Sequence, residues 1–363
     1  MSEAVYHQLA DLLDTLPNGF PKTESGLEIK LLQKMFEPDE AELFCQLKLH
    51  FENVDQIAAR TGRSAGELAE KLESMWRRGL IFGVNLGGTK IFKLLPWVFG
   101  LYEFQIDRMD REFVELAEAY MPYFGAQFFQ HEPALMRTVP IEQELDGAQA
   151  AQHYDRVSAI IEKGQDFAVN DCICKKERRL LGQGCDKPLE VCLAVAPVPG
   201  VFDDHPWGRQ ISKEEAYGVL QKAEEAGLVH LSRNVVQGQD FICNCCGCCC
   251  GILRSINEWQ LDPGPLVKSN YYAVIDAGQC SGCGICADER CQVGAIAETD
   301  EGVYQVSPTR CIGCGLCLTT CPEEAVALVA RPADQVEIPP ANEDEWFDRR
   351  GQSRGVDFSR YKA

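Results

Sequence analysis

Cysteines are the residues of this sequence whose number and spacing could do chemistry. The chain has 19 cysteines in 363 residues. Cys45 stands alone, and the others lie between Cys172 and Cys321 in one group of ten and one of eight. Because thiols inside a cell stay reduced, so dense a set indicates metal ligation or redox chemistry and not disulfides.

The eight C-terminal cysteines form two similar runs. The first is C-x2-C-x2-C with a fourth cysteine after four more residues, and the second is C-x2-C-x2-C-x3-C followed by proline: Cys280, Cys283, Cys286 and Cys291, then Cys311, Cys314, Cys317 and Cys321. Two-residue spacing lets three thiolates from one loop reach three irons of a 4Fe-4S cube, while the fourth comes from elsewhere. Zinc is the alternative, but a zinc site draws its cysteines from two pairs, and a run of three cysteines has one more than such a pair needs.

These runs resemble the bacterial two-cluster ferredoxin domain over residues 269–332. In that family the fourth cysteine of each run binds the other cluster. The resemblance therefore implies two 4Fe-4S clusters, one held by Cys280, Cys283, Cys286 and Cys321, the other by Cys311, Cys314, Cys317 and Cys291. The first run departs from the family in its four-residue gap before Cys291 and in Gln292, where proline is usual.

The ten central cysteines are Cys172, Cys174, Cys185, Cys192, Cys243, Cys245, Cys246, Cys248, Cys249 and Cys250. Neighbours in an extended chain point to opposite sides, so they cannot all bind one metal. We expect one or two further iron-sulfur clusters here, with zinc and reduced or redox-active thiols as alternatives. The pattern of DCIC, GCD and CCGCCCG ahead of the ferredoxin runs resembles a family of multi-cluster iron-sulfur proteins of anaerobic bacteria. That resemblance implies cluster binding and names no reaction.

Four basic residues follow the second central cysteine: Lys175, Lys176, Arg178 and Arg179. They could offset the charge of a cluster, but in an acidic protein we expect a solvated helix face.

The segment from Glu40 to Leu95 predicts three helices and then a β-hairpin around Leu86-Gly87-Gly88. This order resembles a winged-helix domain of bacterial regulators. Its third helix carries Lys71, Arg77 and Arg78, but also Glu67, Glu70 and Glu73. DNA binding needs several cations on one face, so DNA is a possible but not favoured partner, and we expect a docking or structural role.

These segments predict an α+β multidomain protein. It consists of a winged-helix-like domain with an N-terminal extension (1–100), a helical connector (101–145), a cysteine-rich metal-binding α+β domain (146–268), the ferredoxin-like domain with two 4Fe-4S clusters (269–332) and a mobile tail (333–363). In the connector, Tyr102 to Tyr120 should be a helix that ends before Pro122, because proline disfavours a helical residue before it.

Composition and missing motifs limit the function. A formal charge of -20 excludes a general nucleic-acid coat protein, and the apolar run from Leu94 to Tyr102 is too short to cross a bilayer, so we expect a cytoplasmic protein without a membrane span. No nucleotide-binding or serine-nucleophile motif is present, and no autonomous catalytic motif is visible. The favoured function is the transfer of single electrons between redox protein partners. A redox-sensing transcriptional regulator, and a reductase that uses an open iron of a central cluster, are the alternatives.

Overall fold

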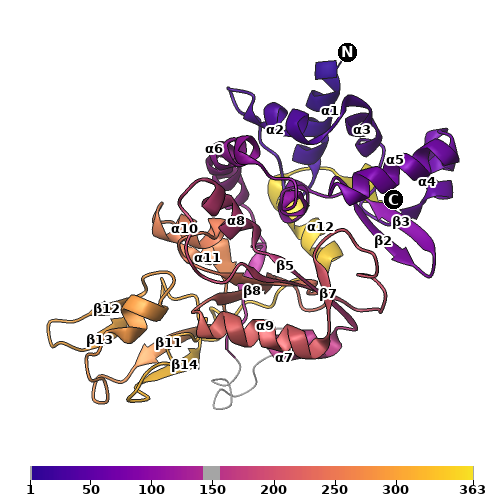
Figure 1. Ribbon diagram of the computed structural model, residues 1–363. Helices are drawn as coiled ribbons and strands as arrows, with labels where there is room; N and C mark the ends of the chain where they lie inside the picture. Colours follow the sequence, from indigo (N-terminus) through magenta and orange to yellow (C-terminus); the bar gives the residue numbers. More distant parts are fainter. Residues whose placement is uncertain (1, 142–155, 363) are drawn as a thin grey trace.

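A computed structural model describes residues 2–141 and 156–362 of the chain. Helices gather at the N-terminal end, a seven-stranded sheet lies at the centre, and two small two-stranded sheets form the ferredoxin-like region (Figure 1). The boundary expected near residue 146 falls outside the described residues. None of the described helices combines the length and the apolar character that crossing a bilayer requires.

The N-terminal part contains the predicted helices and hairpin. Its elements are α1 (Ser2–Thr15), α2 (Leu27–Met35), α3 (Pro38–Phe44), β1 (Glu52–Asn53), α4 (Val54–Thr61), α5 (Ala65–Arg77), β2 (Phe82–Leu86) and β3 (Thr89–Lys93). The strands form an antiparallel sheet in the order β1-β3-β2. Gly87 and Gly88 both have positive φ, which the two-residue turn between Leu86 and Thr89 requires.

The connector differs from the prediction at both ends of its helix. After the short turns η1 (Trp97–Leu101) and η2 (Glu103–Gln105), helix α6 (Arg111–Phe128) begins where the Asp110 side chain accepts a hydrogen bond from the Phe113 amide. The helix continues through Pro122. Proline costs about 3 kcal/mol inside a helix, but Tyr120, Phe124 and Phe128 stack along its buried face and hold both sides of the proline in place.

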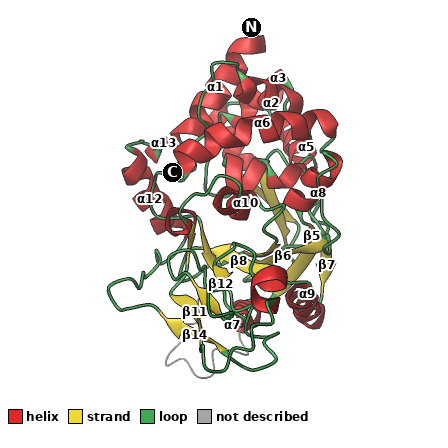
Figure 2. Cartoon of the chain, turned by 90° about the vertical axis from the view of Figure 1, so that its left-hand side faces the viewer, coloured by secondary structure: helices red, strands yellow, loops and turns green. Residues whose placement is uncertain are grey.

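The central sheet has the strand order β10-β4-β8-β9-β6-β5-β7, in which only the β10–β4 pair is parallel. The strands are β4 (Met136–Thr138), β5 (Asp166–Asp171), β6 (Glu190–Ala196), β7 (Arg209–Ile211), β8 (Val229–Arg233), β9 (Phe241–Cys245) and β10 (Val267–Lys268). Helices α7 (Val157–Lys163) and α9 (Lys213–Glu225) cover one face, while α8 (Ile173–Leu180), α10 (Gly251–Asn257) and α11 (Pro263–Leu266) lie on the other, beneath the N-terminal helices (Figures 1 and 2).

The ferredoxin-like region pairs its first strand with its last. Strand β11 (Tyr271–Ile275) is antiparallel to β14 (Val326–Ala330), and β12 (Ile296–Glu298) is antiparallel to β13 (Tyr304–Val306). The turn η5 (Cys286–Arg290) lies between β11 and β12.

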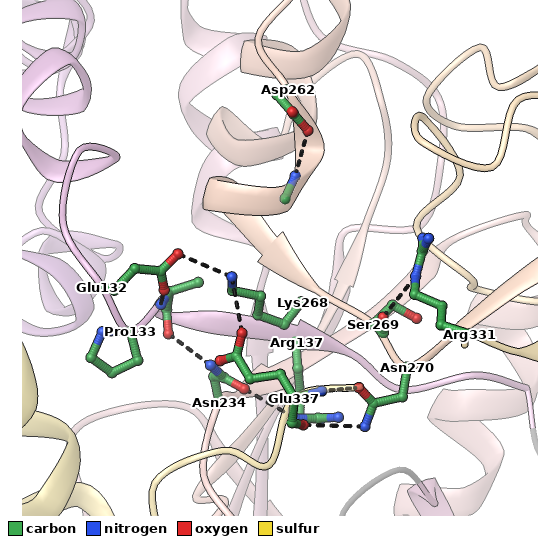
Figure 3. A network of polar contacts seen from close by, with 12 residues as sticks. Glu132, Pro133, Arg137, Asn234, Asp262, Lys268, Ser269, Asn270, Arg331 and Glu337 are labelled. Carbon is green, nitrogen blue, oxygen red and sulfur yellow. Dashed lines mark hydrogen bonds and ion pairs between the residues drawn. The ribbon is translucent and has the colours of Figure 1, made fainter. Parts of the chain in front are cut away.

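A polar network joins this region to the edge of the central sheet (Figure 3). Lys268 on β10 bridges Glu132 and Glu337, each at 3.0 Å, and Asn270 is hydrogen-bonded to the backbone of Glu337. Arg331 donates to the carbonyl of Ser269 at 3.0 Å. Both ends of the ferredoxin-like region are thereby held against the sheet.

The expectation of a mobile tail is wrong. Residues 342–362 contain α12 (Glu343–Arg354) and α13 (Ser359–Lys362). Trp346 is fully buried and donates its indole N-H to the carbonyl of Ala134 at 3.0 Å, while Arg350 lies over the Phe128 ring at 4.2 Å. The tail has few apolar residues, but they are large and aromatic, so a count of core residues underestimates the area that they bury.

Candidate metal and iron-sulfur centres

The first ferredoxin group comes together as the resemblance implies. Cys280, Cys283, Cys286 and Cys321 line one small cavity, together with apolar side chains that include Ile275 and Val326. Gly282 lies between two of the cysteines with a φ of 72°, and a Cβ there would be 2.4 Å from the carbonyl oxygen of Gly302. Only glycine fits this turn, which brings the thiols of one loop toward a common point.

The second ferredoxin group is more deeply buried. Burial raises the pKa of the Cys317 thiol well above its ordinary value, and the nearby Cys314, Cys311, Cys291 and Cys286 raise it further. Backbone amides already point at sulfur: Ala273 and Gly313 donate to Cys311 Sγ at 3.4 Å, and Ala295 donates to Cys291 Sγ at 3.1 Å.

Amide hydrogen bonds to sulfur are characteristic of iron-sulfur sites, where they adjust the reduction potential. Because buried thiols of raised pKa stay protonated without a metal, a bound cation is what would make them thiolates. The donor set, the glycine turns and the amides therefore fit 4Fe-4S clusters.

The unusual gap in the first run has a structural consequence. Cys286 and the four residues before Cys291 form the wide turn η5, which is closed by a hydrogen bond from the Cys291 amide to the carbonyl of Cys286 at 3.1 Å. Gln292, in place of the usual proline, accepts a hydrogen bond from the amide of Gly247 at 2.9 Å. Gly247 lies in the CCGCCC segment, so this departure from the family pattern connects the ferredoxin-like region to the central cysteines.

Four of the central cysteines form a compact group. Cys185 Sγ lies 3.9 Å from Cys246 Sγ and 3.7 Å from Cys249 Sγ, and Cys248 Sγ lies 3.8 Å from Cys249 Sγ. All four sulfur atoms are within 4.8 Å of one another. Burial raises the pKa of Cys248, whereas the hydrogen bond from Cys249 lowers the pKa of Cys246 to about 5. We call these residues the four-cysteine group.

The other six central cysteines lie close enough for neighbouring thiols to shift one another's pKa, and we call them the six-cysteine group. The interacting neighbours follow the order Cys192, Cys243, Cys245, Cys250, Cys174 and Cys172. The hydrogen bond with a neighbouring thiol, followed by burial, raises the pKa of Cys172 and of Cys243 well above the ordinary value. The group contains more thiols than one 4Fe-4S cube binds, so not every member can be a ligand of a single cube.

The structure divides adjacent cysteines between the two groups because their backbone conformations differ. Cys245 is the last residue of β9 and Cys250 precedes the first residue of α10, while the three cysteines of the four-cysteine group lie in the turn between them. The contiguous cysteines therefore contribute to two different groups of thiols.

Lys175 is a buried cation within the cysteine-rich core. Its side chain is fully buried, and its Nζ donates to the carbonyl of Asn244 at 2.9 Å. Burial alone would lower the pKa of Lys175, but Cys172 and Cys246, one from each group, raise it above the ordinary value. The expectation of a solvated helix face is therefore wrong for Lys175, because α8 turns this residue toward the thiols.

The neighbouring basic residues differ from one another. Arg178 is mostly buried and pairs with Glu118 at 2.9 Å, and Arg179 donates to the carbonyl of Cys185 at 3.0 Å. Lys176 is more exposed and lies 3.9 Å from Asp107. Arg179 thus supports the loop that carries Cys185, a structural role that the spacing alone did not indicate.

A cavity of about 520 Å³ opens beside the six-cysteine group. All six cysteines of the group contribute to its wall, together with many aromatic side chains from the N-terminal hairpin, α6 and the central sheet, among them Phe82, Phe99, Phe124 and Phe241. Its volume lies within the range of small-molecule pockets, about 300–1,000 Å³.

Glu177 is one of the polar residues that line this cavity, and it was not among the candidate residues predicted from the sequence. Its side chain is 4% exposed, and its Oε2 accepts a hydrogen bond from the Tyr102 hydroxyl. Among the described residues, Glu177 Oε1 has no hydrogen-bond partner. Burial raises the pKa of Glu177 to about 7. Its position three residues after Cys174 on one helix was a signal in the sequence, since residues so spaced share a face; the proximity of Tyr102 depends on the fold.

Comparison with known families agrees with the ferredoxin-like geometry. Residues 304–327 match the 4Fe-4S binding domain family, and this stretch includes Cys311, Cys314, Cys317 and Cys321. No curated protein and no solved structure matches the chain at a significant level. The matched domain and the cysteine groups together identify an iron-sulfur protein that carries at least one 4Fe-4S cluster.

Proposed function

We propose that the protein carries single electrons from a redox partner through two 4Fe-4S clusters of the ferredoxin-like region to a third cluster held within the six-cysteine group. The observation that carries this proposal is a direct contact between the two regions: the amide of Gly247, in the turn between Cys245 and Cys250, donates a hydrogen bond at 2.9 Å to Gln292, which follows Cys291. The chemistry that bound clusters would supply is one-electron oxidation and reduction.

The positions of the cysteines indicate where electrons would enter the protein and which group of cysteines they would reach next. Cys283 is exposed, and the exposed Asp288 and Glu289 lie close to it in the sequence. A partner with a basic docking surface would be attracted to this end of the molecule. From there the second group lies inward, since Cys286 and Cys317 interact electrostatically, and Gln292 next to Cys291 contacts the central loop at Gly247.

The N-terminal domain contributes a wall of the cavity in this proposal and is not assigned to DNA. The cations of α5 and its C-terminal end are engaged in ion pairs: Lys71 with Asp39 at 2.5 Å, Arg77 with Glu73 at 2.7 Å and Arg78 with Glu40 at 2.5 Å. Phosphate binding would have to break these pairs. The β2–β3 hairpin instead contributes Phe82 and Ile91 to the cavity.

Electron paramagnetic resonance of the reduced full chain, purified without oxygen, tests the proposal. We expect magnetic coupling between a ferredoxin cluster and the central cluster, and loss of that coupling in Cys317→Ser. Cys45→Ser is the matched control, because Cys45 belongs to neither cluster region, and it should leave the spectrum unchanged. A reduced protein whose six-cysteine group holds no iron would refute the proposal.

The cavity favours a second candidate, a reductase in which a small, mostly apolar molecule accepts electrons beside the six-cysteine group. Glu177 would hold or deliver a proton there, since its pKa of about 7 leaves both protonation states populated near neutral pH. Menadione, an apolar quinone, is a suitable probe, and its binding should quench the fluorescence of Trp207 and Trp259 on the cavity wall. Saturable quenching that weakens in Glu177→Gln would support this candidate, and its absence would count against it.

A further inference from the structure

The four-cysteine group has the dimensions of a site for one metal ion. Four thiolates placed tetrahedrally at about 2.3 Å from a zinc ion lie about 3.8 Å from one another. Three of the sulfur-sulfur distances in the group are 3.7, 3.8 and 3.9 Å. On a 4Fe-4S cube each thiolate binds a different iron, so the thiolates must stand farther apart than they do around one ion.

The ferredoxin-like region of the same chain provides an internal comparison. Among all described residues, the four-cysteine group is the one set of three or more potential ligands whose donor atoms lie within 4.8 Å of one another. The eight ferredoxin-region cysteines are described and do not meet this limit. Within one structure, the sulfur atoms of the four-cysteine group therefore lie closer together than those of the ferredoxin-like region, where cubes are expected.

We propose that Cys185, Cys246, Cys248 and Cys249 bind a single zinc ion in a closed tetrahedral site, distinct from every iron-sulfur cluster of the protein. Four thiolates complete the tetrahedron and leave no position for water or substrate, which is typical of a structural and not of a catalytic zinc site. Soft thiolate ligands in a tetrahedral S4 set also favour zinc among the common divalent ions.

The position of the group indicates what this ion would hold together. Cys185 lies in the loop between α8 and β6, and the other three cysteines lie in the turn between β9 and α10. This turn carries Gly247, whose amide is bonded to Gln292 of the ferredoxin-like region. It is also flanked by Cys245 and Cys250 of the six-cysteine group. Zinc would therefore fix the segment that connects the two electron-carrying regions.

Charge around the group is compatible with a bound zinc thiolate. Four thiolates and one Zn²⁺ carry a net charge of about -2, which nearby cations must offset in a partly buried site. Lys175 lies close enough to Cys246 for their charges to interact, and Arg179 binds the backbone of the Cys185 loop at the carbonyls of Cys185 and Lys187.

Metal analysis of the full chain, purified without oxygen, tests the proposal. We expect about one zinc per chain in addition to the iron, and zinc X-ray absorption spectra that show about four sulfur ligands near 2.3 Å with no iron neighbour. Cys248→Ser changes the most exposed ligand of the group, and it should reduce the zinc content several-fold while the iron and acid-labile sulfide stay constant. Cys283→Ser, an exposed cysteine of the ferredoxin-like region, should do the reverse.

The outcomes separate the proposal from its alternatives. Loss of about four irons in Cys248→Ser, with no zinc in the parent chain, would show another 4Fe-4S cluster and overturn the proposal. Loss of one iron would show a mononuclear iron site and overturn the assignment to zinc. If Cys248→Ser fails to fold, the absorption spectra of the unaltered protein still decide, because one zinc with sulfur ligands alone supports the site and no zinc refutes it. Neither result depends on electron transfer.

Discussion

The two glycines of the CCGCCCG motif should respond very differently to alanine. A Cβ at position 247 would lie 2.2 Å from the carbonyl oxygen of Gln292 and 2.7 Å from Asn257 Nδ2, whereas a Cβ at Gly251 would meet nothing within 4 Å. Gly247 therefore lies at a close approach between the central loop and the ferredoxin-like region, and Gly251 is a matched control four residues away in the same motif.

The cost of Gly247→Ala can be worked out from these contacts. The loop would have to move by about 1 Å, and overpacking of this kind costs about 1–3 kcal/mol. Three hydrogen bonds meet at this point: the Gly247 amide on Gln292 Oε1, and Asn257 Nδ2 on the carbonyls of Gly247 and Gln292. Weakening two of them adds about 1–2 kcal/mol, so we expect a total loss of about 2–5 kcal/mol. Gly251→Ala should be neutral or stabilise α10 by up to about 1 kcal/mol.

Urea denaturation of the two variants, followed by tryptophan fluorescence under anaerobic conditions, measures this difference. Gly247→Ala should unfold at a lower urea concentration than the parent and should also weaken the magnetic coupling between the ferredoxin and central clusters. Gly251→Ala should preserve both properties. Equal denaturation midpoints with unchanged coupling in both variants would refute the reasoning, since the close contact with Gln292 would then have no part in joining the regions.

Three further predictions address the tail, the cavity and the clusters. Trp346→Ala should lower the free energy of unfolding by about 3–5 kcal/mol in thermal or urea denaturation, because it empties a fully buried site, whereas Val336→Ala, at a 42% exposed side chain, should change little. Glu177 has its pKa raised from 4.5 to about 7 in the folded protein, so the folded state binds the extra proton and stability should fall as the pH rises between these values. Glu177→Gln should remove that part of the pH dependence, at most about 3 kcal/mol, and an unchanged stability profile would contradict the assigned pKa. Cys317→Ser should lower the iron content by about four atoms per chain, and iron equal to that of the parent would exclude Cys317 as a ligand.

Local patterns in the sequence were enough to predict much of the N-terminal part. The helices between Glu40 and Leu95 bury residues at helical spacing, and the hairpin has a two-residue turn of glycines, which readily adopt the positive φ that it shows at both positions. The connector shows where this reasoning fails. Pro122 indicates the end of a helix, but the packing of Tyr120, Phe124 and Phe128 outweighs the local preference. Aromatic burial of that kind is a tertiary property.

By itself, the spacing of the cysteines predicted a metal-binding protein and the two ferredoxin-like runs, because three thiols in one tight loop can converge without help from the rest of the chain. Only the tertiary structure divided the ten central cysteines into four and six. Cys185, Cys172 and Cys192 come from loops and strands far from the CCGCCC segment, and the direction of each adjacent thiol depends on where β9 ends and α10 begins. The tertiary structure also decided the burial of Lys175, the position of Glu177 Oε1, which has no hydrogen-bond partner among the described residues, and the cavity beside them. Each of these features requires elements that are distant in sequence to pack around one point.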